Sequence, residues 1–468
     1  MSGAPSVVWL TIESTRADHT SVDGTGRDTT PNLRRIARAS KGRSFSKCFS
    51  HGIWTLSSSS SILTGTYPTH HDAGMGSEAI PEGLPTVPEA FRELGYRTAC
   101  LSTNFHCSSA SGLDRGFDRF AWLSKDTLLD VAGPRTLLKY AANLRRHSAG
   151  LTTDAAKHST GYVVTDVLRR WARSLAAGDD PFFLYAHYGD PHRPYYPALP
   201  YQDRYLDDVD ATVAEAREAV MHHHEDCHQL IADGLPLSDK EWAAIGAMYD
   251  AEIAYTDELI GGLFDTLRSR VDDLVFVVTA DHGELFGEGG MLAHKVVVDD
   301  AVSHVPLVVY GHDELVDHDG EMVQHADVGR TILRSLGHDF PSGQGLDLRR
   351  ESRDWSVIQR GADRSERNLE EFQSLNPEFD VDRYHRGTLT AARTDDHKYL
   401  RSPERSELFE LPDERTDVSA RYPNLAASMD ERLDDWMAEF GRPFSAERRE
   451  GSYSEAMRDQ LADLGYLE

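Results

Sequence analysis

The sequence predicts an α/β fold: a doubly wound, mainly parallel sheet flanked by helices, with a smaller C-terminal α+β domain. Two observations predict it. Short apolar runs alternate with amphipathic helical patterns as far as about residue 311. After about residue 345, short segments typical of antiparallel strands and one final helix replace this alternation. We therefore predict a larger domain at residues 1–345 and a C-terminal subdomain at residues 346–468.

Five apolar runs predict the strands of the main sheet. Residues 6–12 and 182–188 are short, continuously apolar and rich in β-branched or aromatic side chains. Residues 274–280 (LVFVVTA) form the strongest such run, and residues 97–102 and 306–311 are shorter ones. Because strands of a parallel sheet are buried on both faces, continuous rather than alternating apolar runs are expected.

Helical patterns lie between these runs. Residues 30–39, 86–95, 163–176 and 239–270 have the apolar spacing and start signals of amphipathic helices. The Ser-rich segment 56–64 could be a linker, but apolar residues flank it, so we predict an ordered strand-to-helix turn.

The C-terminal part has a different pattern. Residues 387–400 and 406–411 resemble short antiparallel strands, and residues 424–439 resemble an amphipathic helix. A short antiparallel sheet with a terminal helix is therefore expected in the C-terminal subdomain.

The chain is strongly acidic. Its 468 residues carry a net charge of −28, and only eight of the 49 basic residues are lysine. Such a charge repels nucleic acid and anionic membranes, so neither is expected as a partner. An acidic, lysine-poor surface resembles that of halophilic proteins, and high salt would screen its self-repulsion. An acidic protein of a mesophile is the alternative.

The cysteines and the N-terminus bear on the compartment. The four cysteines form no CxxC pair and are expected to be free thiols in a reducing environment. The N-terminus has no basic segment followed by a long apolar run, and no stretch predicts a transmembrane helix. A cytoplasmic location is therefore expected.

Polar clusters follow three of the predicted strands. Glu13 follows the strand predicted at residues 6–12, and Asp281 and His282 follow residues 274–280. At the end of the strand predicted at residues 182–188, residues 187–192 contain two histidines and an aspartate. Open α/β sheets bind ligands at the carboxyl ends of their strands. Carboxylate and imidazole ligands together suit one divalent ion, which could be Ca²⁺, Mg²⁺, Mn²⁺ or Zn²⁺.

With these clusters in place, the sequence resembles the sulfatase family of the alkaline phosphatase superfamily, and in particular haloarchaeal sulfatase-like hydrolases with Thr in place of the formylglycine Cys. The matching segments are residues 7–24, 29–37, 54–71, 101–109, 112–120, 184–197, 249–267, 277–295, 304–311 and 397–411. They cover nearly the whole chain in the family's order. The resemblance implies a metal-dependent hydrolase with a doubly wound catalytic domain.

The resemblance also implies the metal ligands. Glu13 stands where sulfatases usually have Asp, and Asp281 and His282 match the second metal-binding segment. His282 needs an acceptor at its other ring nitrogen, for which Glu284 is a candidate. Glu is one methylene longer than Asp, so the metal could sit differently or bind more weakly. In the alternative interpretation, Glu13 is a surface residue of a degenerate site that binds no metal.

The nucleophile segment departs most from the family. Sulfatases have Cys-x-Pro-Ser-Arg-x-x-x-x-Thr-Gly, and alignment on Thr64-Gly65 puts Thr55 at the Cys and Ser59 at the Arg. A Thr cannot become formylglycine, but as a metal-activated nucleophile and fourth metal-contacting residue it could form an ester that water then cleaves. In the alternative interpretation the site is inactive and its Ser and Thr side chains only cap a helix.

The remaining site residues are also implied by the resemblance. His294 is expected to be the general acid, with Lys295 in reserve, and His192 to contact the anion or the leaving group. Asn104 matches a substrate-contacting position. Apart from the resemblance, Arg193 is a candidate for bidentate anion binding by its guanidinium chemistry alone.

The predicted function is hydrolysis of sulfate esters, with a small anionic ester or a sulfated glycan as substrate. Phosphate mono- or diester hydrolysis is the main alternative, because a Thr nucleophile favours it chemically. A catalytically silent binding protein of the same fold is the second alternative.

Overall fold

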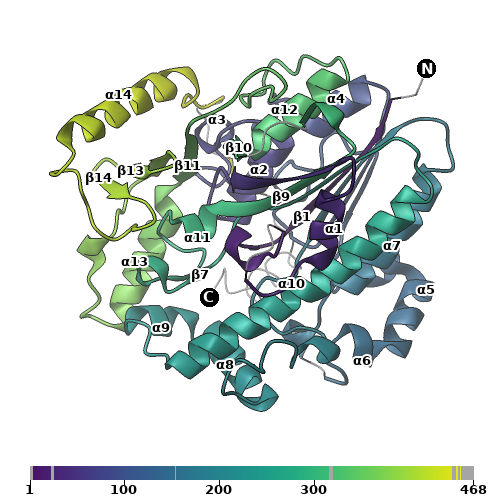
Figure 1. Cartoon of the computed structure of the whole chain (residues 1–468), viewed down its shortest axis with the longest axis horizontal. Coiled ribbons are helices and arrows are strands. Elements are labelled where there is room, and N and C mark those ends of the chain that lie inside the picture. The colour runs from purple at the N-terminus through teal and green to yellow at the C-terminus, as the bar shows by residue number, and fades with distance from the viewer. Residues whose placement is uncertain are drawn as a thin grey trace.

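The computed structural model describes residues 4–22, 26–152, 154–315, 320–444, 449–451 and 454. Its centre is an eight-stranded sheet with helices on both faces (Figure 1). From one edge to the other, the strands are β10 (Val323–Gln324), β2 (Gly42–Phe49), β9 (His304–Tyr310), β6 (Leu274–Ala280), β1 (Ser6–Ile12), β5 (Phe182–Tyr188), β3 (Arg97–Ser102) and β4 (Arg119–Trp122).

The sheet is mainly parallel, as predicted. β6, β1, β5, β3 and β4 pair in parallel with one another in this order, and β9 is antiparallel to both β6 and β2. Alternate residues of β1 enter two different cores: Val7 and Trp9 face one, whereas Val8 and Leu10 face the other. This burial on both faces explains why the strand is apolar without interruption.

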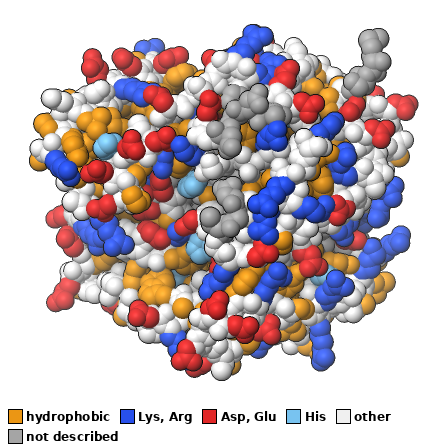
Figure 2. Space-filling model, viewed as in Figure 1, with side chains coloured by type: hydrophobic (Ala, Val, Ile, Leu, Met, Phe, Trp, Pro, Cys, Tyr) orange, Lys and Arg blue, Asp and Glu red, His pale blue; other side chains and the backbone are white. Residues whose placement is uncertain are grey.

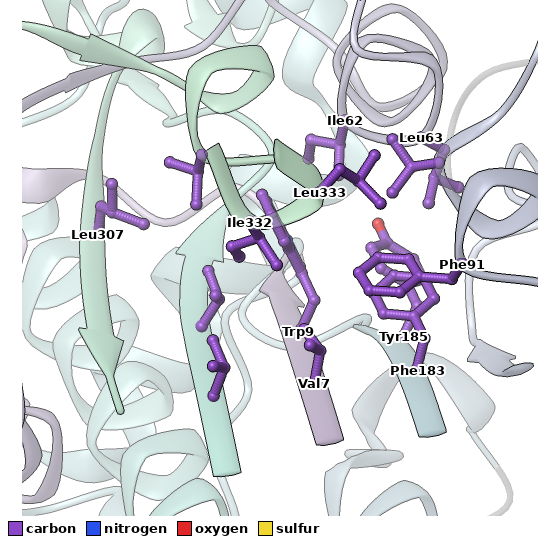
Figure 3. Packing of buried hydrophobic residues seen from close by; sticks show 14 of the residues in the cluster. Val7, Trp9, Ile62, Leu63, Phe91, Phe183, Tyr185, Leu307, Ile332 and Leu333 are labelled. Carbon is purple, nitrogen blue, oxygen red and sulfur yellow. The ribbon is translucent and has the colours of Figure 1, made fainter. Parts of the chain in front are cut away.

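Three helices cover the first face of the sheet. They are α2 (Thr55–Thr64), α4 (Val87–Glu93) and α12 (His325–Ser335), and their apolar residues pack on side chains of β1, β5 and β9 (Figure 3). Phe91 of α4 stacks on Phe183 of β5 with ring centroids 4.2 Å apart. The packing fixes α2, whose first residue lies at the candidate site.

Other helices cover the second face of the sheet. These are α1 (Pro31–Ala37), α5 (Leu128–Ala142), α7 (Gly161–Leu175) and α10 (Asp239–Arg268), and α7 and α10 cross the lower right of Figure 1. The remaining helices of this part are α3 (Pro68–His71), α6 (Leu144–His147), α8 (Val213–Glu225), α9 (Cys227–Ala232) and α11 (Asp300–Ser303), with the hairpin β7 (Leu285–Phe286) and β8 (Leu292–Ala293).

A second, antiparallel sheet lies in the C-terminal part. It consists of β11 (Ser356–Arg360), β12 (Leu389–Arg393), β13 (His397–Arg401) and β14 (Ser406–Glu410). α14 (Pro423–Glu439) packs on it, and α13 (Ala362–Leu375) packs against α9. The predicted small sheet with a terminal helix is therefore confirmed, whereas the boundary at residue 345 stays a prediction.

The Ser-rich segment is a helix. Thr55–Thr64 form α2, every residue of which is buried, and Gly65 ends the helix with φ 65°. A left-handed residue at this position closes the last turn, and glycine adopts it without strain. The segment is therefore a helix rather than the predicted turn. The sequence did not indicate a helix, because small buried Ser side chains give no apolar periodicity.

The surface is charged and mixed. Figure 2 shows acidic and basic side chains interspersed over one face of the molecule. All four cysteines are free and buried, which agrees with the prediction of free thiols. No helix within the described residues combines the length and the apolar character needed to cross a bilayer.

Candidate active site

Four adjacent strands end beside one another at one edge of the main sheet. β6, β1, β5 and β3 are neighbours in this order and run parallel. Asp281 follows β6, Glu13 follows β1, and Asn104 lies two residues after β3. His187 is the next-to-last residue of β5. Residues far apart in the sequence therefore meet at the edge where open α/β sheets bind ligands.

The hydroxyl group of Thr55 points into this edge from the first residue of α2. Thr55 Oγ1 donates a hydrogen bond of 2.8 Å to Glu13 Oε1 and lies 3.5 Å from His282 Nε2. One ligand atom each from Glu13, Asp281 and His282 lie within 4.8 Å of one another, and all three side chains are buried. The structure thus brings together the four residues for which metal contact was predicted.

Asp281 has one oxygen that the protein does not satisfy. Its Oδ1 accepts from the backbone N–H groups of Ser14 (3.1 Å) and His282 (2.9 Å). Its Oδ2 is buried and has no hydrogen-bond donor among the described residues. Burial raises the pKa of Asp281, which a cation beside it would reverse. An orphaned carboxylate oxygen, a second carboxylate and an imidazole fit a divalent cation.

The carboxylate of Glu13 is surrounded by donors. Asn104 Nδ2 lies 2.8 Å from Oε1 and 3.0 Å from Oε2, and His187 Nε2 lies 3.1 Å from Oε2. Burial alone would raise the pKa of Glu13, but the hydrogen bond and the charge of His187 hold it well below its usual value. Glu13 is therefore buried and ionised, which contradicts the interpretation of Glu13 as an exposed surface residue.

Two further histidines line the same site. The ring of His294 lies 4.6 Å from that of His282 and 5.7 Å from that of His192, centroid to centroid. Burial lowers the pKa of His192 to about 4. Burial, with the neighbouring His282, also lowers the pKa of His294 well below its usual value. Both imidazoles are therefore neutral at neutral pH in the ligand-free chain.

Glu284 is paired differently from expectation. We considered it as a partner of His282, but His282 Nδ1 lies 2.8 Å from the carbonyl oxygen of Gly283. Glu284 Oε1 instead lies 3.4 Å from His294 Nδ1, and burial raises the pKa of Glu284 to about 8. The backbone carbonyl orients His282 and leaves its Nε2 facing Thr55.

Three cationic residues were considered for the site or lie near it: Arg193, Lys295 and Arg16. Arg193 is buried, and its Nη1 donates to the backbone carbonyl of His224 at 3.4 Å. Lys295 is also buried, and burial lowers its pKa to about 7. No hydrogen bond or ion pair between described residues joins Lys295 to Glu13 or Asp281. Arg16 forms ion pairs of 2.7 Å with Asp18 and Glu288.

Position 59, where sulfatases have an arginine, is a serine in this chain. Ser59 is buried within α2, and the guanidinium of Arg16 is paired with Asp18 and Glu288. The positive end of α2 faces the cluster, because Thr55 is the first residue of this helix.

His187 lies in the site, but no role was predicted for it from the sequence. It belongs to the cluster at residues 187–192 that predicted a site at this strand end. The signal was its position: in β5, His187 pairs in register with Thr11 of β1, two residues before Glu13. Parallel pairing therefore places the two side chains at the same edge.

Comparison with known proteins identifies relatives of this chain. A family model described as Sulfatase matches residues 5–338. The uncharacterized sulfatase YidJ of Escherichia coli is 22% identical over 311 residues, which cover 63% of this chain and 61% of YidJ. The multifunctional alkaline phosphatase superfamily protein PehA of Trinickia caryophylli is 24% identical over 72% of this chain and 74% of its own length.

Solved structures share the fold. The phosphonate monoester hydrolase of Agrobacterium radiobacter superposes with a TM-score of 0.71 at 21% identity, covering 93% of this chain and 96% of that protein. Because the superposition covers 93% of this chain, the shared fold includes the main sheet and reaches into the C-terminal sheet. The chain nevertheless spans only about three fifths of the length of YidJ.

Proposed function

This chain belongs to the sulfatase family, and we propose that it is a metal-dependent hydrolase of sulfate esters. In this proposal Thr55 is the nucleophile. One observation carries the proposal. The Thr55 hydroxyl lies 2.8 Å from a carboxylate and 3.5 Å from an imidazole, inside a buried cluster at the carboxyl ends of parallel strands. A hydroxyl that only capped a helix would instead face backbone N–H groups.

Glu13, Asp281 and His282 would hold one divalent ion, which could be Ca²⁺, Mg²⁺, Mn²⁺ or Zn²⁺. Such an ion supplies a positive charge for the ester oxygens and lowers the pKa of a neighbouring hydroxyl. The fit is supported by the unsatisfied Oδ2 of Asp281 and by the ionised state of Glu13.

Thr55 Oγ1, whose proton points to Glu13 Oε1, releases that proton to bulk water and attacks the sulfur atom. A bond forms between Thr55 Oγ1 and sulfur, and the bond from sulfur to the alcohol oxygen breaks. Thr55 is also the first residue of α2, so the positive end of the helix dipole stabilises the anionic group in front of it. Water then cleaves the ester on Thr55 and releases sulfate.

His294 gives the departing alcohol its proton, and His192 contacts the anion from the other side. Both histidines are neutral in the ligand-free chain, because burial lowers their pKa values. An anionic ester bound beside His294 raises that pKa again and loads the acid only when substrate is present. Lys295, whose pKa is about 7, is the second candidate for the proton donor.

Phosphate mono- or diester hydrolysis is the second candidate, and the identity of residue 55 favours it. A formylglycine hydrate can expel sulfate by collapsing to an aldehyde, whereas a Thr ester needs attack by water. Hydrolysis of a phosphorylated hydroxyl is common enzyme chemistry. The proposed natural substrate in either case is a small anionic ester. For sulfate ester hydrolysis, a sulfated glycan is the family-level candidate.

A substrate panel separates these candidates. The purified full chain is assayed in high salt with each of the four ions, on an aryl sulfate, an aryl phosphate, an aryl phosphodiester and an aryl phosphonate monoester. Turnover that is lost with a chelator and restored by one of the ions supports the metal-dependent hydrolase, and the preferred ester names the substrate class. No turnover of any ester with any ion would favour a catalytically silent binding protein.

A further inference from the structure

Glu13 is held on both of its oxygens. Thr55 and Asn104 donate to Oε1, each at 2.8 Å, and Asn104 also reaches Oε2 at 3.0 Å. His187 Nε2 lies 3.1 Å from Oε2, the oxygen that Thr55 does not contact. A carboxylate with this set of donors has little freedom to rotate.

His187 must be the donor in its contact with Glu13. An ionised carboxylate only accepts hydrogen bonds, so His187 Nε2 carries the proton that faces Oε2. Its other nitrogen, Nδ1, lies 3.8 Å from the Cys107 sulfur, within reach of a weak sulfur hydrogen bond. His187 and Cys107 are both buried. Contacts at the two nitrogens thus fix the ring plane of His187.

The backbone of His187 is equally fixed. β5 lies between β1 and β3, and His187 pairs with Thr11 on one side and with Ser102 on the other. The same Nε2 atom is 3.9 Å from Asp281 Oδ2. The imidazole therefore closes the side of the cluster that faces β5, next to two of the three residues proposed as metal ligands.

We propose that His187 is the positioning residue of the metal site, which it serves by pinning Glu13 Oε2 so that Oε1 is the oxygen presented to the ion and to Thr55. A Glu side chain has one more rotatable bond than the Asp that sulfatases usually have here, so it needs one more anchor to hold a single geometry. This inference rests on the metal site proposed above.

Metal affinity tests the proposal without using activity. Mn²⁺, Ca²⁺, Mg²⁺ and Zn²⁺ are titrated calorimetrically into the metal-free full chain, and the ion that binds most tightly is kept for the variants. We expect His187→Phe to weaken its binding about 10–100-fold. His187→Gln can place an N–H donor near the position of Nε2 and should recover most of that loss.

A matched control is His71→Gln. His71 is buried like His187 and has hydrogen-bond partners at both nitrogens, Ser61 Oγ at 3.0 Å and the backbone N–H of Ala73 at 3.1 Å. It makes no hydrogen bond with Glu13 among the described residues. This variant should lose stability without losing metal affinity, and an affinity loss as large as that of His187→Phe would overturn the proposal.

A double-mutant cycle isolates the coupling to Glu13. In a Glu13→Asp background the shorter carboxylate no longer reaches His187, so adding His187→Phe should change the affinity less than about twofold. An undiminished effect in that background would overturn the proposed coupling.

The two proposals fail in different ways. Wild type that binds an ion while His187→Phe binds it equally well overturns the role of His187 and leaves the metal site standing. Wild type that binds none of the four ions overturns the metal site and the role of His187 together.

Discussion

Replacing Thr55 by Ala separates catalysis from folding. Thr55 is fully buried and donates one hydrogen bond to Glu13, so the variant loses a hydrogen bond to a charged group, which contributes about 1.5–3 kcal/mol. Glu13 keeps Asn104 and His187 as donors, so no carboxylate oxygen is stranded. Against a typical unfolding free energy of roughly 5–15 kcal/mol, the variant should stay folded.

The effect on turnover should be far larger. Removal of a nucleophile leaves only binding and electrostatic stabilisation of the transition state, and we expect kcat to fall by at least roughly 10⁴-fold. A factor of that size corresponds to about 5 kcal/mol of activation free energy. Thr55→Ser is the matched control, because it keeps the hydroxyl group and should retain measurable turnover.

The assay is initial-rate hydrolysis of whichever ester the wild type turns over best, with the preferred ion and in high salt. Thermal unfolding of each variant under the same conditions checks that the loss is not unfolding. Mass spectrometry of the acid-quenched wild type should find the sulfuryl or phosphoryl group on the peptide that contains Thr55. Undiminished turnover by Thr55→Ala would refute the assignment of the nucleophile.

Three further predictions concern stability. Arg353 forms a largely buried ion pair with Asp327, so Arg353→Leu should lower the unfolding free energy by about 3–5 kcal/mol in denaturant titrations. Phe183 stacks on Phe91 in the core, and Phe183→Ala should lower it by about 3–5 kcal/mol in the same assay. The pKa of Lys295 is about 7 in the folded chain and near its ordinary value when unfolded, so the unfolded chain binds more protons between these values. The unfolding free energy of wild type relative to Lys295→Met should therefore rise with pH from 7 to 10, by up to about 1.4 kcal/mol per pH unit.

Each of these has a clear contrary result. A loss below about 1 kcal/mol for Arg353→Leu or Phe183→Ala would mean that the site relaxes around the missing group, and the packing argument would fail. A wild-type curve parallel to that of Lys295→Met across the same pH range would mean that the Lys295 amine titrates alike in the folded and unfolded chains. Arg432→Leu is a control for Arg353, because Arg432 pairs with an exposed carboxylate, Asp354, and should change stability little.

Several strands could be predicted because residues buried on both faces of a sheet are mostly apolar. Residues 6–12, 97–102, 182–188 and 274–280 were predicted with the bounds that the structure has. Residues 6–12, 182–188 and 274–280 are continuous runs of mostly apolar residues, as burial on both sheet faces requires, whereas residues 97–102 (RTACLS) are only half apolar. β2 was not predicted, because its residues (GRSFSKCF) mix polar, charged and apolar side chains, and three of them are only partly buried.

The candidate site was predictable in its members but not in its contacts. The ends of apolar strands indicated Glu13, Asp281 and His282, and the structure places these three side chains together. Which side chain pairs with which depends on strand order and register, which one sequence does not contain. That is why Glu284 was considered for His282 although it lies beside His294, and why His187 was given no role.

A crystal structure of the chain soaked with the ion it binds most tightly tests the central claim most directly, with the ion identified by its anomalous scattering. We predict one ion held by Glu13, Asp281 and His282, with Thr55 Oγ1 directed at it. An ion bound elsewhere, or a Thr55 hydroxyl turned away from the occupied site, would contradict the proposed metal-dependent nucleophile.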